Sequence, residues 1–196
     1  MKKTTLSFFI LSVFITLFAG GCKKTFDINH DPDNPTLDVG TAQLVFPVGV
    51  MGIAVPIGGE LAITGAIFGE YLTQAANTSQ YKAISQYDIK ATDNDRFYRT
   101  LYTSGLKNLQ YVIDKSKENN DWNHFLMATV MKAYGVSVLV DLFDQVPYSQ
   151  ALQGAANIAP SFDDGYTVYQ SLLGSIDSAL NQPLVTGKTD NSDIIF

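Results

Sequence analysis

The chain has 196 residues, of which 46% are hydrophobic and 16% are charged, and its formal net charge at pH 7 is −6. This composition is typical of a globular protein that is long enough for one sizeable core. The chain contains no basic block that would neutralise phosphates, which argues against a nucleic-acid partner.

Residues 1–21 are organised like a secretion signal peptide. Two lysines at the start are followed by an apolar run, residues 6–18, that is too short to span a bilayer comfortably. Small residues then lead into Cys22, the only cysteine, so no intramolecular disulfide can form. This order resembles a bacterial lipobox, although Ala19 stands where a leucine is usual. We expect cleavage just before Cys22 and acylation of its thiol; the alternative is a chance cysteine behind an ordinary signal peptide.

Residues 22–38 are predicted to form an extended linker behind the lipid anchor. The segment 27–36 consists largely of Asp, Asn and Pro, which bond their own backbone or prevent regular pairing. A calcium loop built from Asp31, Asp33 and Asn34 is the alternative. The segment lacks the glycine and the distal glutamate of such a loop.

The next stretch, residues 39–59, carries no charge, as a transmembrane helix would. Its prolines, its glycines and Gln43 argue against a helix that faces lipid. We therefore predict two helices packed into a protein core, roughly 40–54 and 58–74. Residues 74–95 are polar and are predicted to form a long loop.

Two further helices are predicted over residues 95–117 and 121–143. Asp93 or Asn94 would cap the first, and Asp121 would cap the second by accepting a backbone N–H bond. The second helix has apolar residues on every side, so we expect it to be the buried central rod of the domain. The two helices would form an antiparallel pair, which is the unit of helical repeats.

The central helix is predicted to end in a turn at Pro147, because proline has no N–H to continue a helix and biases Val146 away from helical angles. A last helix would follow Pro160-Ser-Phe-Asp163, with Asp163 as its cap, and end at Leu180. Residues spaced by four would form its buried face: Val168, Leu172, Ile176 and Leu180.

Four of these segments resemble, in the same order, motifs of the SusD/RagB family of outer-membrane nutrient-binding lipoproteins. They are the lipobox, the Asn/Pro segment 27–36, the turn segment 141–152 and the Pro-x-aromatic-Asp segment before the last helix. The turn segment, Asp-Leu-Phe-Asp-Gln-Val-Pro-Tyr-Ser-Gln-Ala-Leu, is similar to the family's Asp-x-Phe-Gly-Asp-Val-Pro-Tyr-x-x-Ala-Leu. Asp144 replaces the usual glycine and Gln145 the usual aspartate. Because aspartate tolerates a left-handed backbone, the turn should survive this change.

The resemblance implies an all-α, mainly helical-repeat (TPR-like) SusD-type domain over residues 39–196, with long irregular loops. Family members are longer, so we expect the chain to be the N-terminal portion of a larger protein, incomplete at its C-terminus. The motif residues of the turn are expected to have a structural role: Asp141, Phe143, Val146, Pro147 and Tyr148.

The resemblance also implies a function. We expect a lipoprotein of the outer membrane, facing the cell surface, that binds a glycan, oligosaccharide or peptide and delivers it to a SusC-like TonB-dependent transporter. The alternative is a lipid-anchored helical-repeat scaffold that binds only other proteins. An aromatic platform facing solvent would favour nutrient binding, whereas a continuous concave protein groove would favour the scaffold.

The loop 74–95 is the expected position of ligand binding. Aromatic faces pack on the apolar side of a sugar ring, and amide side chains bond to its hydroxyl groups. The candidate binding residues are therefore Asn77, Tyr81 and Tyr87. In the alternative, the loop is a solvated connection whose tyrosines fold back onto the helices. Trp122 would be a stronger platform, but its place in a buried helix predicts packing.

No catalytic or metal site is predicted. The two histidines, His30 and His124, are far apart in sequence and have no partner at the spacing of metal ligands. The sequence contains no nucleophile elbow, phosphate loop or dinucleotide fingerprint. Asp141 and Asp144 could form an acid/base pair, but capping and turn formation are commoner roles. We expect a binding protein without a cofactor rather than an enzyme.

Overall fold

The computed structural model describes residues 39–186 and 190–195, and this part of the chain is all-α, as predicted. Helices make up 64% of it, and no strand occurs among the described residues. The helices lie in the compact unit Gly40–Phe196. The predicted signal peptide, the lipid-attachment residue Cys22 and the linker, with its alternative calcium loop, lie outside the described residues.

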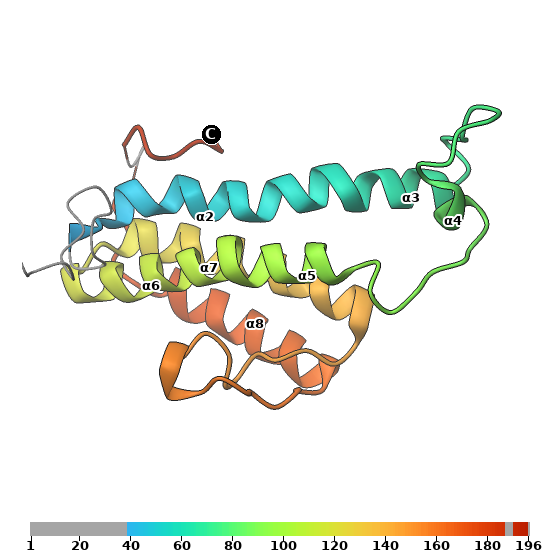
Figure 1. Ribbon diagram of the computed structural model, residues 1–196. Coiled ribbons are helices and arrows are strands. Elements are labelled where there is room, and N and C mark those ends of the chain that lie inside the picture. The colour runs from blue at the N-terminus through green and yellow to red at the C-terminus, as the bar shows by residue number, and fades with distance from the viewer. Residues whose placement is uncertain (1–38, 187–189, 196) are drawn as a thin grey trace, which may run out of the picture. The chain divides into compact units, whose positions relative to one another are not determined.

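The first helix is a continuous rod made of three segments: α2 (Ala42–Pro56), the π-helical η3 (Ile57–Leu61) and α3 (Ala62–Phe68). Figure 1 shows the rod along one side of the helical unit. Thr41 caps it, because its hydroxyl oxygen accepts the N–H of Leu44 at 3.3 Å.

The predicted break between residues 54 and 58 is wrong, and so is the predicted continuation to residue 74. Pro47 and Pro56 both lie inside the helix. Each proline removes only one backbone donor, and the helix widens into the π-helical segment η3 directly after Pro56. The rod ends at Phe68, where Gly69 forms the C-cap.

The remaining helices follow in this order: α4 (Lys82–Ser85), α5 (Asp95–Thr100), the π-helical η4 (Leu101–Leu106), α6 (Lys107–Asn119), α7 (Trp122–Phe143), the short 3-10 helix η5 (Gly154–Ala156) and α8 (Gly165–Leu180). The predicted helices 95–117 and 121–143 are therefore confirmed to within two residues. Asn94 occupies the cap position of α5 without a side-chain bond. Asp121 caps α7 as predicted, accepting the N–H of His124 at 3.2 Å.

The central helix α7 packs against α6, α8, α2 and η4. Leu139 is fully buried, and Val136 and Val140 are nearly so. The expectation that the whole rod is buried is wrong for one face, however, because Val130 and Tyr134 are exposed. Trp122 packs as predicted, edge-on to Phe125 with 5.8 Å between the ring centroids.

Glycines allow α2, η4 and α7 to approach closely around Ile53. A Cβ atom added at Gly105 would lie 2.4 Å from Ile53 Cδ1, and one added at Gly135 would lie 2.5 Å from the same atom. A Cβ at Gly52 would lie 2.4 Å from the backbone of Ser104. The fully buried Ile53 thus occupies space that glycines on η4 and α7 leave open.

The last helix begins one residue later than predicted. Asp164, and not Asp163, is its cap, with its carboxylate accepting the N–H of Thr167 at 3.0 Å. The predicted buried face is right for Val168 and Leu172. It is wrong at its end, because Leu180 is exposed and Ala179 is buried instead.

A buried histidine ties residues 190–195 to the start of α7. His124 Nδ1 lies 2.8 Å from Asp121 Oδ2, and Nε2 lies 2.8 Å from Ser192 Oγ. The order acid, histidine, hydroxyl is that of a catalytic triad, but the single hydroxyl proton of Ser192 is donated to Asp190. A hydroxyl that already donates elsewhere is not activated by the histidine, so we assign the cluster a structural role.

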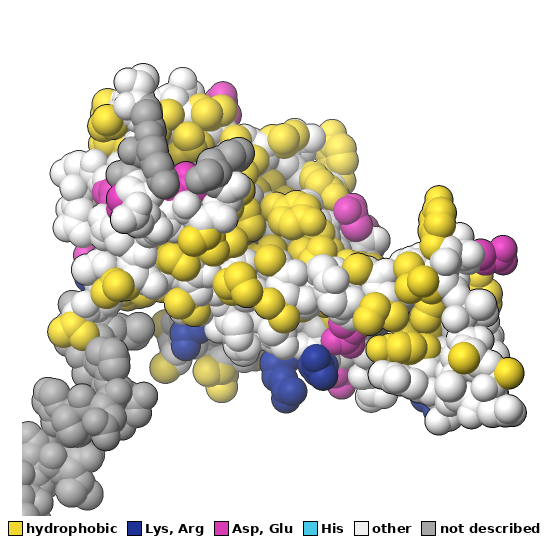
Figure 2. Space-filling model, turned by 90° about the horizontal axis from the view of Figure 1, so that it is seen from above, with side chains coloured by type: hydrophobic (Ala, Val, Ile, Leu, Met, Phe, Trp, Pro, Cys, Tyr) yellow, Lys and Arg dark blue, Asp and Glu magenta, His cyan; other side chains and the backbone are white. Residues whose placement is uncertain are grey.

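In the part of the chain that the structure describes, two helices are long and apolar enough to cross a membrane, Ala42–Phe68 and Trp122–Phe143, but 33% and 44% of their most apolar stretches are buried inside the unit. One face of α2 remains exposed. It carries the α2 stripe, defined as Leu44, Val48, Met51 and Val55, each more than half exposed. Figure 2, which looks down on α2, shows hydrophobic side chains gathered on this side.

Candidate functional site

The turn after α7 is fixed by contacts from three other elements. Asp141 accepts a hydrogen bond from the hydroxyl of Tyr169 at 2.5 Å, and the ring of Phe143 meets that of Tyr98 edge-on at 5.5 Å. Asp144 has a φ of 60°, a conformation that favours glycine and that the family's usual glycine would adopt more readily.

The segment around Asp163 holds the other side of this turn. Val146 and Asp163 exchange two backbone hydrogen bonds, of 3.2 and 3.0 Å. The Asp163 carboxylate also accepts the N–H groups of Tyr148 and Ser149, at 2.9 and 2.8 Å, and the Ser149 hydroxyl at 2.7 Å. These bonds, those from Ser149 first, lower the pKa of Asp163. The two sequence motifs therefore meet in space, which explains why Asp163 is not free to cap α8.

Another contact to the turn comes from Tyr102 in η4. Its hydroxyl donates to the carbonyl of Pro147 at 2.7 Å. Burial, together with the neighbouring Tyr98, raises the pKa of Tyr102 well above its ordinary value, so the hydroxyl remains a donor. The motif residues thus lie within a hydrogen-bonded turn, and their structural role stays a prediction.

A cavity of about 560 Å³ lies where the predicted loop meets the end of the first rod. The volume falls within the range of roughly 300–1,000 Å³ that is usual for small-molecule sites. Its lining is partly apolar and partly polar: Gly59, Glu60, Leu61, Ile63, Thr64, Phe68, Gln80, Tyr81, Ile84, Ile89, Asp93, Asn94, Arg96 and Leu142. We call it the loop cavity.

The three predicted binding residues have different positions around this cavity. Tyr81 lines it, and its hydroxyl oxygen accepts a bond from Gln80 Nε2 at 3.2 Å. Asn77 is exposed, occupies a turn with a φ of 69° and is not among the lining residues. Tyr87 stacks on Phe68, with 5.1 Å between ring centroids and 18° between planes. It is still 63% exposed, so it has folded back onto the helix while keeping one side open to solvent.

An ion pair that the sequence analysis missed lies on the wall of the loop cavity. Glu60 Oε2 is 3.6 Å from Arg96 Nε, joining η3 to α5. Glu60 is the only charged residue of the helix Ala42–Phe68, and this isolation within an apolar run was the available signal. It also lies in a π-helical segment, a feature frequent at functional sites.

The cavity combines an aromatic ring and aliphatic side chains with amide, hydroxyl and charged groups. Such a mixture suits a ligand that has apolar faces and hydroxyl edges. Within residues 39–186 and 190–195, no three His, Cys, Asp or Glu side chains lie close enough together to hold a metal ion. The side chains that line this site can stack on a ligand and form hydrogen bonds with it.

Comparison with known proteins identifies the family. A search of curated proteins finds no match to the chain. A SusD-like family model, described as "Starch-binding associating with outer membrane", matches residues 60–196. The match covers well over half of the chain and includes the loop cavity's elements from Glu60 onward, the turn after α7 and α8. The chain therefore belongs to the SusD-like family.

Proposed function

We propose that the protein is an outer-membrane lipoprotein that binds a nutrient, a glycan or oligosaccharide rather than a peptide, in the loop cavity. The observation that carries this proposal is the position of Tyr81 on a cavity of sugar-compatible size and chemistry. The family description supports a starch-like ligand.

In this proposal the ring of Tyr81 stacks on the apolar face of a sugar ring. The Glu60–Arg96 pair lies on the wall of the same cavity, where charged donors and acceptors form stronger bonds to hydroxyl groups than neutral ones do. Tyr87, held on Phe68 with one side open, would extend the aromatic surface beyond the cavity.

The test is a calorimetric titration of the mature chain, without its lipid, with maltoheptaose. Tyr81→Ala should weaken binding by about 1–3 kcal/mol, the size of a lost stacking contact or bond. Tyr166→Ala is the matched control, because Tyr166 is an exposed tyrosine on α8 that does not line the cavity. If both variants bind maltoheptaose as tightly as the wild type, binding lies outside the loop cavity. If the wild type does not bind maltoheptaose, a starch-like ligand is excluded.

The proposal includes a lipid anchor at Cys22, an orientation towards the cell surface and delivery of the ligand to a SusC-like TonB-dependent transporter. The α2 stripe supports a partner protein, because an apolar face of this kind on a soluble domain is typical of an interaction site. Val48→Lys would then reduce co-purification with the transporter and leave maltoheptaose binding unchanged.

The second candidate function is a lipid-anchored helical scaffold that binds only other proteins. The same α2 stripe favours it, since the stripe needs no small ligand to explain it. Loss of partner proteins in Val48→Lys, combined with no binding of any saccharide by the wild type, would favour the scaffold over nutrient capture.

A further inference from the structure

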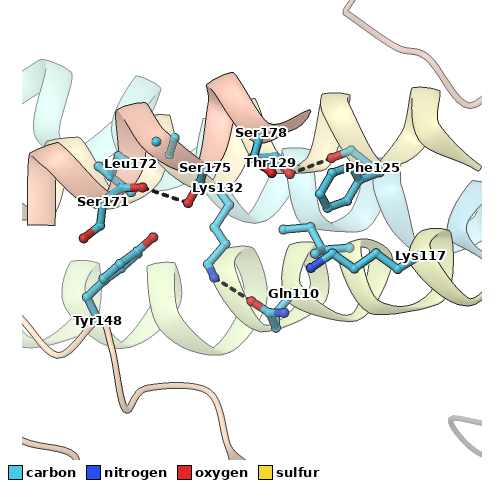
Figure 3. Close-up of a pocket in the computed structure, with 13 residues that line it drawn as sticks. Gln110, Lys117, Phe125, Thr129, Lys132, Tyr148, Ser171, Leu172, Ser175 and Ser178 are labelled. Carbon is cyan, nitrogen blue, oxygen red and sulfur yellow. Dashed lines mark hydrogen bonds between the residues drawn. The ribbon is translucent and has the colours of Figure 1, made fainter. Parts of the chain in front are cut away.

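A second cavity, of about 360 Å³, lies between α6, α7 and α8 and shares no lining residue with the loop cavity. Figure 3 shows its walls. They are Gln110, Ile113, Lys117, Phe125, Thr129, Lys132, Ala133, Tyr148, Ser171, Leu172, Gly174, Ser175 and Ser178. Ser171 and Ser178 are exposed, so the cavity opens to solvent along α8. We call it the lysine cavity.

The charge of this cavity is opposite to that of the chain. Of the described residues that line it, only Lys117 and Lys132 are charged, although the chain carries a net charge of −6. Both lysine side chains reach into the space between the helices (Figure 3). Electrostatic attraction therefore favours a negatively charged ligand over a neutral one.

Lys132 keeps unused donors inside this cavity. An ammonium group has three N–H donors, and Gln110 Oε1 is the one acceptor that Lys132 Nζ reaches among the described residues. Gln110 in turn donates to Asp114 at 2.8 Å; this carboxylate does not line the cavity, but it lines an adjoining hollow together with Lys132. Burial lowers the pKa of Lys132, an effect that Asp114 opposes and Lys117 reinforces. A bound anion would offset this desolvation.

Three hydroxyl groups of the cavity are arranged as acceptors. Thr129, Ser171 and Ser175 each donate their hydroxyl proton to a backbone carbonyl four residues earlier. Their oxygen lone pairs remain available to hydroxyl groups of a ligand. A bare carboxylate has no donor for these oxygens, whereas a sugar has several. The ring of Tyr148, with Lys132 Nζ 5.6 Å from its centroid, adds an aromatic face.

We propose that the lysine cavity binds one carboxylate-bearing sugar unit, a uronate, with its carboxylate on Lys132 and its hydroxyl groups on the α8 serines. The site is independent of the loop cavity, with which it shares no lining residue. The size is sufficient for one small ligand, because it falls at the lower end of the range of roughly 300–1,000 Å³ for such sites.

The experiment is an NMR titration of the mature, lipid-free chain with glucuronate, glucose and acetate. Glucuronate should bind saturably and at least tenfold more tightly than glucose, which lacks the charge, or acetate, which lacks the hydroxyl groups. Lys132→Met should weaken glucuronate binding at least tenfold, or about 1.4 kcal/mol. The matched control is Lys107→Met, the same change at an exposed lysine of α6 outside the cavity, which should leave binding unchanged.

A second variant acts by filling space. A Cβ atom at Gly174 meets nothing within 4 Å, so Gly174→Leu should fold, favour the helix and obstruct the cavity, abolishing glucuronate binding. Thermal unfolding of each variant checks that the fold is retained. The proposal is overturned if glucose or acetate binds as well as glucuronate, or if both Lys132→Met and Gly174→Leu fold and bind glucuronate like the wild type. Tyr81→Ala should not affect glucuronate, which separates this outcome from that of the loop cavity.

Discussion

Asp163 shows how one side chain can join two parts of the chain that sequence analysis treats separately. Its carboxylate accepts three hydrogen bonds from Tyr148 and Ser149, and its backbone pairs with Val146. Helix capping and this turn compete for such a residue, and the adjacent Asp164 provides the cap instead. The sequence predicts that an aspartate caps α8. Whether Asp163 or Asp164 is the cap depends on the hydrogen bond to Tyr148, 15 residues earlier, which the local sequence pattern does not reveal.

We expect Asp163→Ala to destabilise the protein by roughly 1–3 kcal/mol, because it leaves backbone N–H groups of the turn without an acceptor. Urea unfolding of the variant and the wild type measures the difference. Asp177→Ala, at an exposed position late in α8, is the control and should cost within about 0.5 kcal/mol. Equal stabilities of Asp163→Ala and the control would show that the turn does not depend on this carboxylate.

The same residue predicts a pH dependence. The pKa of Asp163 is lowered from 3.8 by the bonds to its ionised form, so its stabilising contribution is present above the unfolded pKa and is lost as pH falls through the lower folded pKa. The stability difference between the wild type and Asp163→Asn should therefore be largest above about pH 5 and shrink in more acidic solution. A constant difference between pH 7 and pH 2.5 would contradict this account.

At the scale of single elements, the helices with strong apolar patterns were predictable. The position of α7 followed from its capping aspartate and from Pro147, and both ends agree closely with the structure. The first rod was predicted as two helices because proline normally interrupts a helix. The structure accommodates Pro56 by the π-helical segment η3, an irregular helix that periodicity does not predict. Packing against the neighbouring helices decides that one face of α7 stays exposed.

Truncating a buried side chain of α7 measures how much this helix contributes to the stability of the core. Leu139→Ala should cost roughly 2–5 kcal/mol, because it removes a fully buried side chain and leaves a cavity. Leu173→Ala on α8 is the matched control at a residue that is 61% exposed, and should cost within about 0.5 kcal/mol. Similar values for the two variants in urea unfolding would show that α7 is not the centre of the core.

The close approach of α2, η4 and α7 predicts that adding a methyl group destabilises the protein. Gly105→Ala should cost about 1–3 kcal/mol, since its Cβ would overlap Ile53 at 2.4 Å. Gly65→Ala is the control, because a Cβ there meets nothing within 4 Å and alanine favours the helix. In thermal unfolding, Gly105→Ala should lower the unfolding temperature and Gly65→Ala should raise it. Stabilisation by both substitutions would mean that the helices are not in tight contact.

At the scale of the whole molecule, membrane attachment is the prediction that depends on the N-terminal sequence alone. Mass spectrometry of the protein from its native host should find a mature chain that begins at an acylated Cys22. Cys22→Ser should release the protein from the membrane fraction. A mature form that starts elsewhere, or one with an unmodified Cys22, would contradict the lipobox interpretation.

The family and the helical class were predictable because the residues within each motif, and within each helical pattern, lie close together in the sequence. The two cavities were not, because each brings together side chains from distant segments, such as Glu60 with Arg96 and Lys132 with Ser171. Six residues of the predicted loop 74–95 line the loop cavity, Tyr81 among them, and ligand binding by this loop stays a prediction. Periodicity identifies helices, whereas a cavity depends on how their faces meet.

The position of glycan binding is the central claim, and amide hydrogen exchange with and without maltoheptaose tests it most directly. Binding in the loop cavity should slow exchange in peptides that cover residues 59–68 and 80–96, because ligand contacts order η3, α3, α4 and the start of α5. Exchange in α8, residues 165–180, should not change. Protection that appears in α8 or elsewhere while both loop-cavity segments exchange as before would contradict the account.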